Sequence, residues 1–275
     1  MNARWWFVYS DTSRYLEYFQ IVDFIFLTFK NIGIQCMKIP ASTLITNYED
    51  TLSSASFLPD NVLFGDKNWH VASKLQKVGI HVYNNANSAI VEDKIATYEA
   101  LNDYGIIPKT LIYSVGKAKR NLEKIIKIIR FPILAKLSES VHGNNVFRLE
   151  NESMLVNFLN NYEEQVIIAF QETLTFSPKV EVKVCSTKSQ ILSSYKRYSL
   201  NDGTLKSEDY TLTEKEAEMC KYVCGILDLE IGGIDIMYRD ENTPLICDVN
   251  TQPNVLNIFK ILGINVIEKF IYSLI

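Results

Sequence analysis

The chain has 275 residues, of which 47% are hydrophobic and 22% charged, a composition typical of a compact protein with two or three lobes of about 100 residues each. Its 28 basic and 32 acidic residues give a net charge of −4, so the composition offers no basic surface for a polyanion and disfavours nucleic acid as a partner. The five cysteines are scattered and odd in number, which disfavours a disulfide framework and favours reduced thiols in the cytoplasm.

Residues 1–88 predict a small parallel α/β lobe, because strands alternate with helices there. The expected strands are residues 4–10, 34–40, 61–66 and 80–84, and the expected helices are residues 14–30 and 69–79. The first helix contains the most apolar early stretch, but Gln20 and Asp23 interrupt it, and about 12 residues are too few to cross a membrane. We find no targeting signal before it, so we expect a cytoplasmic protein without a membrane partner.

Residues 89–170 predict a second lobe. A helix is expected over residues 91–105, with Gly105 at its end, and a strand is expected to follow Pro108. The next helix is amphipathic, and its apolar residues fall at i, i+3, i+4 and i+7: Leu122, Ile125, Ile126 and Ile129. The remaining expected elements are a hairpin with arms at 133–137 and 146–150, a helix at 152–161 and a strand at 166–170.

Residues 171–275 predict a third lobe. The expected elements are strands at 179–184 and 191–198, a helix at 213–227, a hairpin within 232–254 and a final helix at 265–275. Cys220 and Cys224 form a C-x3-C pair in the helix, which we interpret as one turn of a buried face. A metal site is disfavoured there because no matching His/Cys pair follows, and the three histidines lie in different segments.

The hairpin within "GGIDIMYRDENTPLICDVNTQPN" contains two aspartates and an asparagine where a strand's side chains usually pack. A four-residue loop at 240–243 is of a common length and sets the pairing of the two arms. The expected cross-strand pairs are Arg239 with Pro244, Asp235 with Asp248, and Gly233 with Asn250.

Alternation of side chains places Asp235, Asp248 and Asn250 on one face of this hairpin. The other face is expected to carry Ile234, Ile236, Cys247 and Val249. Two carboxylates directly across a strand pair repel each other unless a cation lies between them or one is protonated, and oxygen ligands suit Mg²⁺. We expect Gly233 to leave space for a ligand beside Asn250. The alternative is a solvent-facing hairpin with incidental acids.

Four segments of the chain, taken in order, resemble the ATP-grasp ligases. "DVNTQP" is similar to the family's metal-binding strand, and "VEDKIATYEALNDYGIIPKT" is similar to its Asp-Lys helix followed by a G-I-x-x-P-x-T strand. "FPILAKLSESVHGNNV" resembles the strand with a phosphate-binding lysine and the loop that covers the phosphates, and "AFQETL" resembles the adenine-binding hinge. The likeness covers essentially the whole chain and is greatest for the RimK-like glutamate ligases that modify ribosomal protein and for the amino-acid-carrier ligases.

The resemblance implies an α/β protein, α+β in its nucleotide-binding half, with three lobes (1–88, 89–170 and 171–275) and ATP held between two of them. The implied ATP-binding residues are Lys94, Lys136, Ser140, His142, Gly143, Asn144, Gln171, Glu172, Thr173, Leu174 and Glu181. Asp235, Asp248 and Asn250 would hold Mg²⁺, with two ions expected and Mn²⁺ as an alternative metal. Lys183 and Arg197 take positions where the family has arginines near the reacting groups, and Arg197 is the candidate for oxyanion stabilisation.

Each assignment has an ordinary alternative in the residues themselves. Lys94 equally suits a solvated position in the first turn of a helix, and Glu181 and Lys183 alternate with valines as in any half-exposed strand. The chain also departs from the family pattern. The phosphate loop contains one glycine, Gly143, Asp248 replaces the more usual Glu, and the stretch after Arg197 is shorter than in relatives.

The expected activity is ATP-dependent ligation of a carboxylate to an amine through an acyl phosphate. One substrate would be an amino acid or similar amine, and the carboxylate would belong to a small molecule, peptide, protein or carrier. Relatives often pair through their outer lobes, so a homo-oligomer is also considered. Two other hypotheses remain: an ATP-binding regulatory or scaffold protein that keeps the fold without ligation, and an α/β binding protein that does not use nucleotide.

Overall fold

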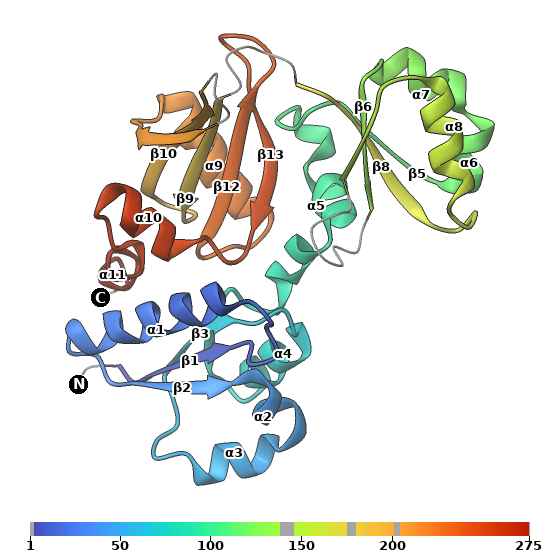
Figure 1. Cartoon of the computed structure of the whole chain (residues 1–275). Helices are drawn as coiled ribbons and strands as arrows, with labels where there is room; N and C mark the ends of the chain where they lie inside the picture. Colours follow the sequence, from blue (N-terminus) through green and yellow to red (C-terminus); the bar gives the residue numbers. More distant parts are fainter. Residues whose placement is uncertain (1–2, 138–145, 175–179, 201–203, 275) are drawn as a thin grey trace.

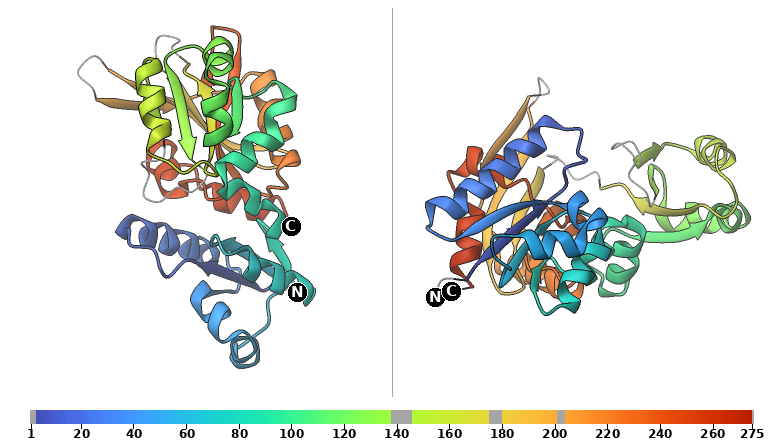
Figure 2. Two further views of the ribbon diagram at one scale, coloured as in Figure 1. Left: turned by 90° about the vertical axis from the view of Figure 1, so that its right-hand side faces the viewer. Right: turned by 90° about the horizontal axis from the view of Figure 1, so that it is seen from below.

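A computed structural model describes residues 3–137, 146–174, 180–200 and 204–274. Three sheets form successive parts of the chain. In Figure 1 the first sheet (blue to cyan) lies below, the third (orange to red) lies above it, and the second (green to yellow) lies to one side. Figure 2 shows the second sheet and its helices projecting away from the other two parts.

The first sheet is parallel and has the order β2-β1-β3-β4. Its strands are β1 (Trp5–Tyr9), β2 (Cys36–Pro40), β3 (Asn61–Gly65) and β4 (His81–Tyr83). Its helices are α1 (Leu16–Asn31), α2 (Ala41–Thr46), α3 (Tyr48–Ser54) and α4 (Trp69–Lys77). Along β1, Trp5 and Phe7 share a core with α1, whereas Trp6 and Val8 share a core with α2 and α4. Both faces are covered, as the predicted alternation of strands and helices requires.

The second sheet is antiparallel and has the order β5-β8-β6-β7. Its strands are β5 (Thr110–Ser114), β6 (Ile133–Leu137), β7 (Val146–Leu149) and β8 (Ile167–Glu172). The helices α6 (Val115–Arg120), α7 (Leu122–Ile129) and α8 (Glu152–Asn160) cover one face and enclose a core with the strands. The predicted hairpin is confirmed, because β6 and β7 pair antiparallel from Ile133 with Leu149 to Lys136 with Val146.

The third sheet is antiparallel and has the order β11-β10-β9-β12-β13. Its strands are β9 (Val180–Ser186), β10 (Ile191–Ser199), β11 (Leu205–Asp209), β12 (Gly232–Tyr238) and β13 (Pro244–Asn250). The helices η1 (Ala86–Glu92) and α5 (Lys94–Leu101) lead into the second sheet, and α9 (Glu214–Ile226) packs with α5 against the apolar face of the third. The helices α10 (Val255–Leu262) and α11 (Val266–Tyr272) join the core that contains α1.

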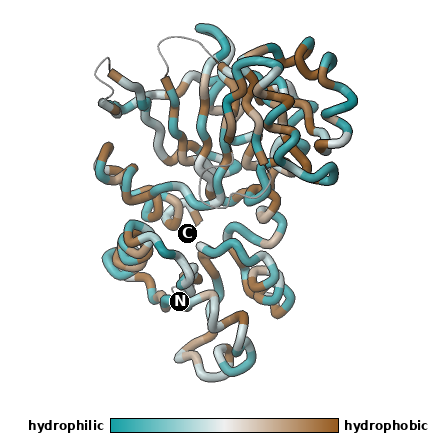
Figure 3. Tube along the Cα trace, turned by 45° about the vertical axis from the view of Figure 1, so that its right-hand side comes forward, coloured by the Kyte–Doolittle hydropathy of each residue, from teal (hydrophilic) through white to brown (hydrophobic). Residues whose placement is uncertain are grey.

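The apolar residues lie where the amphipathic patterns predict. Figure 3 shows hydrophobic and hydrophilic stretches alternating along the outer helices. Cys220 and Cys224 are fully buried free thiols in the core beneath the third sheet, so the prediction of a buried helical turn is confirmed. Among the described residues, no helix combines the length and the apolarity that a membrane-spanning segment requires.

Asn84 joins the first part of the chain to the third. Its side chain donates to the carbonyls of Ile231 (2.9 Å) and Thr251 (2.7 Å) and accepts from the Ile231 amide (3.2 Å). These two residues lie directly before β12 and directly after β13, so one side chain fixes the ends of both strands of the hairpin. Asn84 is 4% exposed and has a φ of 56°, a left-handed conformation that asparagine tolerates.

Replacing Asn84 with alanine is expected to lower the free energy of unfolding by about 2–4 kcal/mol, because it leaves three backbone groups without a buried partner. Chemical denaturation of the full chain measures this change. Asn87→Ala is the matched control, since Asn87 is exposed and its side-chain amide donates to the Asp228 carboxylate, and this substitution should lower the free energy of unfolding by less than about 0.5 kcal/mol. Equal effects of the two substitutions would show that Asn84 does not hold the strand ends.

Candidate active site

A cavity of about 410 Å³ lies between the second and third sheets, with α5 at its side. It brings together nine of the residues predicted from the sequence: Lys94, Lys136, Gln171, Glu172, Thr173, Leu174, Glu181, Asp235 and Asp248. These residues come from α5, β6, β8 with the segment after it, β9, β12 and β13. The cavity is therefore the place where the predicted phosphate-binding, hinge and metal-binding segments meet.

The β12–β13 hairpin has the predicted register at its acidic end. Gly233 pairs with Asn250, and Asp235 pairs with Asp248, so this part of the prediction is confirmed. A β-bulge follows, and beyond it Tyr238 faces Pro244, so the predicted pair of Arg239 with Pro244 is wrong by one residue. The extra residue of the bulge is Cys247, which has no cross-strand partner.

The bulge also changes the direction of Cys247. We predicted that Cys247 shares the buried face of the hairpin with Ile234, Ile236 and Val249. Instead Cys247 lines the cavity, and Ile246 takes the core position. An inserted residue shifts the alternation of side chains by one, which is why a count from the turn alone placed it on the wrong face.

The space expected beside Gly233 is filled by the chain itself. A Cβ atom at Gly233 would lie 3.3 Å from both Cα and Cβ of Pro253. The prediction that Gly233 leaves room for a ligand beside Asn250 is therefore wrong. The glycine instead permits the segment after β13 to approach the strand closely.

A row of charges crosses the third sheet on the cavity face. Lys183 lies opposite Asp235 on β9, and its Nζ is 2.6 Å from Asp235 Oδ2 and 3.2 Å from Glu181 Oε2. On the far side of the row, Lys94 forms an ion pair with Asp248. Each of the paired aspartates thus has its own lysine, which offsets the repulsion between the two carboxylates.

Asp235 and Lys183 in this row both have shifted pKa values, and burial is the largest influence on each. Burial raises the pKa of Asp235 and the Asp248 charge adds to the rise, while Lys183 opposes it. Burial works against the charged form of Lys183, but its ion pairs with Asp235 and Glu181 raise its pKa overall. Lys183 thus partly offsets the cost of burying the Asp235 carboxylate.

The donor set suits a hard cation. Asp235 and Asp248 offer carboxylate oxygens, and Asn250 Nδ2 donates to Asp248 Oδ2 at 3.3 Å, which places the Asn250 side chain beside this pair. Within the described residues, no group of three or more His, Cys, Asp and Glu side chains could hold a metal ion. Two carboxylates and one amide are few protein ligands, a set compatible with Mg²⁺, which keeps several waters and is bound by few carboxylates together with phosphates.

Lys136 is a buried ammonium at the inner wall of the cavity. It is 7% exposed, and its Nζ donates to Tyr98 Oη at 2.5 Å. Tyr98 in turn donates to the Cys247 carbonyl at 2.9 Å. Burial lowers the pKa of Lys136 to about 8, while the nearby Cys247 and Asp248 act in the opposite direction. This lysine would gain its missing counter-charge from an anion such as a phosphate.

The helix α5 positions two of these groups. Asp93 caps its first turn by accepting from the amides of Ile95 (2.8 Å) and Ala96 (3.3 Å), so Lys94 begins the helix. Lys94 and Tyr98 are four residues apart and so share one face of α5. That face meets β13 at Asp248 and at the Cys247 carbonyl.

The hinge residues use their side chains to join segments. Gln171 is 1% exposed and donates to Thr110 Oγ1 at 2.9 Å, and Thr173 donates to the Pro132 carbonyl at 2.7 Å. The Glu172 carboxylate accepts from the Lys109 amide at 2.7 Å and forms an ion pair with Arg239. No role was predicted for Arg239, although its place at the loop of the hairpin was visible in the sequence.

Arg197 and Glu181 form a tight pair on neighbouring strands. Arg197 lies opposite Glu181, and its Nη2 and Nε are 2.5 and 3.1 Å from Glu181 Oε2. Burial opposes ionisation of Glu181, but Lys183 and Arg197 lower its pKa overall. The two predicted catalytic residues, Lys183 and Arg197, thus meet at one carboxylate on the cavity face of the sheet.

A family model described as "RimK-like ATP-grasp domain" matches residues 91–274. The chain belongs to the RimK-like ATP-grasp family. Membership in this family implies ATP-dependent ligation of a carboxylate to an amine. The predicted resemblance and fold class are confirmed by this match and by the solved ATP-grasp ligases that share the fold.

Individual relatives are distant. An uncharacterized protein of Mycoplasma pneumoniae, the MG012 homolog, is 23% identical over 81% of this chain and 82% of its own length. Human beta-citrylglutamate synthase B is 22% identical over 90% of this chain, which spans 65% of the synthase. A solved structure of the ATP-grasp ligase PsnB with minimal precursor, Mg and ADP superimposes with a TM-score of 0.73 at 14% identity, over 100% of this chain and 98% of that one.

Part of the expected ATP-grasp phosphate loop lies outside the described residues. Ser140, His142, Gly143 and Asn144 all fall in 138–145. The strands that flank this segment, β6 and β7, are paired up to Lys136 and Val146, and both of these residues line the cavity. Further lining residues that the sequence did not mark are Leu134, Val146, Arg148, Met237 and Cys247.

Replacing Tyr98 with phenylalanine is expected to raise the KM for ATP about fivefold, because one hydrogen bond of about 1 kcal/mol to the Lys136 ammonium is lost. The hydroxyl stabilises the charged lysine, so its loss should also move the alkaline limb of kcat/KM for ATP to lower pH. Steady-state kinetics between pH 6 and about 9.5 measure both effects. Tyr104→Phe, at an exposed tyrosine, should leave both unchanged. A wild-type pH profile in Tyr98→Phe would contradict the role of the hydroxyl.

Proposed function

We propose that the chain is an ATP- and Mg²⁺-dependent, ADP-forming ligase that joins a carboxylate to an amine through an acyl phosphate. An amino acid or similar amine would be one substrate, and the carboxylate would belong to a small molecule, a peptide, a protein or a carrier. The observation that supports this most is the convergence at one cavity of Lys94, Lys136 and the opposed pair Asp235 and Asp248. Two cationic and two acidic side chains arranged in this way suit a nucleoside triphosphate in complex with a metal ion.

The proposed reaction has two steps, and each forms one bond and breaks one bond between heavy atoms. A carboxylate oxygen of the substrate attacks the γ-phosphorus of ATP, the bond from that phosphorus to the bridging oxygen breaks, and ADP leaves. The amine then attacks the acyl carbon, a tetrahedral oxyanion forms, phosphate leaves, and the nitrogen loses a proton. Neither step requires a covalent intermediate with the protein, so catalysis depends on positioning and on charge stabilisation.

The residues of this chain would divide that work. Lys94 and Lys136 would bind the phosphates, and Asp235, Asp248 and Asn250 would hold Mg²⁺, two ions in our expectation, with Mn²⁺ as a substitute. The metal, when bound, supplies a Lewis acid that neutralises developing phosphate charge. Arg197 would donate to the oxyanion, and Lys183 would stabilise the reacting acyl phosphate. Glu181 would orient both cations and contact the ribose.

The remaining assignments concern the adenine, the loop over the phosphates and the boundaries of the lobes. Residues Gln171 to Leu174 would hold the adenine, and Ser140, His142, Gly143 and Asn144 would cover the phosphates. The three sheets support lobes at residues 1–88, 89–170 and 171–275, with ATP between the second and third. We also propose that the enzyme works in the cytoplasm.

A hydroxylamine trap tests the proposal. The full chain is incubated with ATP, Mg²⁺, hydroxylamine and pools of carboxylic acids, and hydroxamate and ADP are measured. We expect both products from at least one pool, because hydroxylamine captures an acyl phosphate. A pairwise screen of acids and amines, with mass measurement of the product, then identifies the substrates. The absence of ADP and hydroxamate from every pool would contradict catalysis.

The loop with a single glycine and the shortened segment after Arg197 favour a second candidate, an ATP-binding regulatory or scaffold protein without ligase activity. Calorimetry with ATP and Mg²⁺ separates the two. Tight nucleotide binding with no turnover, and no effect of Arg197→Ala, would support the second candidate over the ligase.

A further inference from the structure

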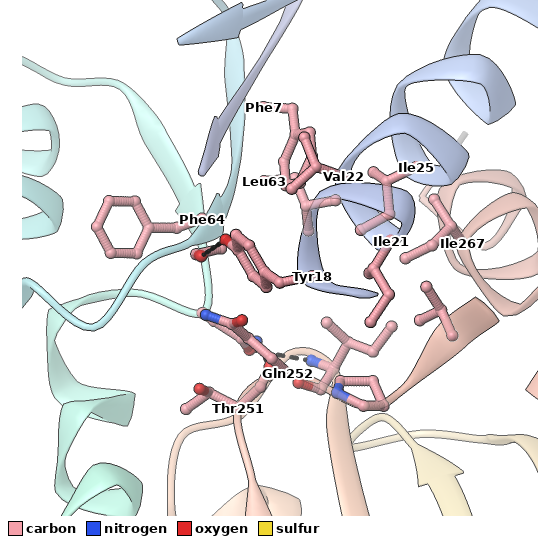
Figure 4. A pocket seen from close by; sticks show the side chains of 15 residues that line it. Phe7, Tyr18, Ile21, Val22, Ile25, Leu63, Phe64, Thr251, Gln252 and Ile267 are labelled. Carbon is pink, nitrogen blue, oxygen red and sulfur yellow. Dashed lines mark hydrogen bonds between the residues drawn. The ribbon is translucent and has the colours of Figure 1, made fainter. Parts of the chain in front are cut away.

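A second, smaller cavity of about 50 Å³ lies where the first sheet and α1 meet the segment after β13. Figure 4 shows its walls: Ile21, Val22 and Ile25 project from α1 on one side, and Thr251 and Gln252 lie on the other. None of the described residues that line it carries a charged side chain, and most are aliphatic or aromatic. The cavity is thus apolar, unlike the charged cavity between the second and third sheets.

The small cavity adjoins the proposed ligation site through one residue. Pro253 lines the cavity and also packs against Gly233, which pairs with Asn250 at the acidic end of the hairpin. Thr251, another lining residue, directly follows Asn250 in the chain. Pro253 thus lies between the acidic row and this space, and a substrate that reaches both would pass around it.

The position of the cavity in the first sheet is also one where α/β proteins bind ligands. In the order β2-β1-β3-β4, the chain moves outward in opposite directions from the neighbours β1 and β3. Ligands bind at such a switch point, beyond the carboxyl ends of the strands. Tyr18 spans these ends, because its hydroxyl donates to the Gly65 carbonyl (2.8 Å) and accepts from the Ser10 amide (2.9 Å). The tyrosine ring forms part of the cavity wall (Figure 4).

The size and the lining of the cavity define the group that fits. A water occupies about 10–15 Å³ on this measure, so the space holds about four such spheres, which matches a branched side chain of three or four carbons. A carboxylate or ammonium placed there would lose its hydration without gaining an ionic partner, which costs several kcal/mol. Gln252, with an exposed side chain at the rim, offers an amide for the polar part of the same molecule.

We infer that this cavity receives a small, uncharged aliphatic group of one of the two ligation substrates, best matched by the side chain of valine or leucine. The inference rests on the proposed function and deepens it, since it names the class of side chain that the site selects. On this inference the substrate side chain differs from that of glutamate, which the names of some relatives contain, such as human beta-citrylglutamate synthase B.

Substrate selectivity tests the inference. ADP release by the full chain is measured with valine, leucine, glutamate, aspartate and lysine, each offered as the acid and as the amine against a mixed pool of partners. We expect kcat/KM for valine or leucine to exceed that for glutamate by about 100-fold or more. Equal or better use of glutamate would overturn the inference and leave the ligase proposal intact.

A binding measurement keeps the two proposals distinguishable. Calorimetry with L-valine and with L-glutamate, in the presence of ADP and Mg²⁺, reports on the cavity even if no turnover is found. Without ADP release in any mixture the proposed function fails, whereas tighter binding of valine than of glutamate still supports the cavity assignment. The reverse order of affinities overturns it.

Substitutions on the wall locate the effect. Ile21→Trp fills the space and should raise the Kd for valine about tenfold or more, with a smaller effect on alanine. Val22→Ala enlarges it and should favour leucine over valine by about fivefold relative to wild type. Leu27→Trp, on the same helix at a side chain that is 51% exposed, is the control and should change neither. Unchanged selectivity in both wall variants would show that the cavity is a packing gap between the lobes.

Discussion

Replacing Asp248 with alanine is expected to abolish Mg²⁺-dependent ATP turnover, lowering kcat by more than about 100-fold. The substitution removes one of the two opposed carboxylates and leaves Asp235, beside Lys183, as the remaining acid of that pair. The fold should persist, because the Asp248 side chain is 31% exposed and its partner Lys94 can return to solvent. The expected loss is therefore a loss of metal binding and not of structure.

Two measurements separate these effects. ATP turnover is followed as a function of Mg²⁺ concentration, and thermal unfolding is followed without nucleotide. Glu241→Ala is the matched control, since it removes an exposed acid from the loop of the same hairpin and should leave turnover unchanged. Near-normal turnover in Asp248→Ala would show that the hairpin does not hold the metal.

The acidic row could be predicted because it depends on short-range rules. A turn of known length and a side-chain period of two are sufficient to pair Asp235 with Asp248, and both residues lie within 14 positions of each other in the sequence. The bulge at Cys247 could not be predicted in this way. An extra residue in one strand is accommodated by packing around it, here including the hydrogen bond from Tyr98 to the Cys247 carbonyl, and the local sequence does not mark it.

The groups that connect distant segments were missed for a related reason. Tyr98 was expected as an ordinary residue of the helix over 91–105, and only the fold brings it to Lys136 and to β13. Asn84 was expected as the last residue of the strand at 80–84, with no further role, whereas its side chain binds the backbone at Ile231 and Thr251. Contacts of this kind join residues 38 to 167 positions apart, beyond the reach of any periodic pattern.

Some elements were missed because their local signals are weak. The helices α2 and α3 span 6 and 7 residues, too short for a helical period to be visible. The strand β11 consists largely of polar, exposed residues and forms the edge of its sheet, so no alternation of apolar residues marks it. By contrast, α7 carries apolar residues at i, i+3, i+4 and i+7, and α1, expected at 14–30, is observed at Leu16–Asn31.

Replacing Lys136 with methionine is expected to lower ATP turnover by more than about 100-fold and to make the folded chain more stable. The lysine would be a principal phosphate ligand, so its loss removes charge stabilisation in both the bound and the transition states. Without phosphate, however, its ammonium is buried, and the one hydrogen-bond partner that it has among the described residues is a tyrosine hydroxyl, a costly arrangement that an apolar side chain of similar length relieves. Tyr98 keeps a partner in the Cys247 carbonyl.

The pH dependence of this gain has a definite sign. Burial lowers the pKa of Lys136 from 10.5 to about 8, so below pH 8 the folded and unfolded chains both carry the charge and the folded chain bears the full cost. Above pH 8 the folded chain releases the proton that the unfolded chain keeps until about 10.5, and wild-type stability rises relative to the variant. The free energy of unfolding of Lys136→Met should therefore exceed that of wild type by up to about 3 kcal/mol at pH 7. This difference should shrink between pH 8 and about 10.

Denaturant titrations of the nucleotide-free chain at pH 7, 8, 9 and 10 measure this difference. Lys124→Met, at an exposed lysine of α7, is the control and should show no pH-dependent change in stability or loss of turnover. A loss of stability in Lys136→Met at pH 7 would contradict the buried, weakly compensated ammonium. Full turnover in that variant would instead remove the lysine from the phosphate site. The stability measurement thus tests whether the Lys136 charge is buried, and the turnover measurement tests whether it binds phosphate. The proposed site requires both properties, because an anion binds Lys136 strongly only where water has been excluded from it.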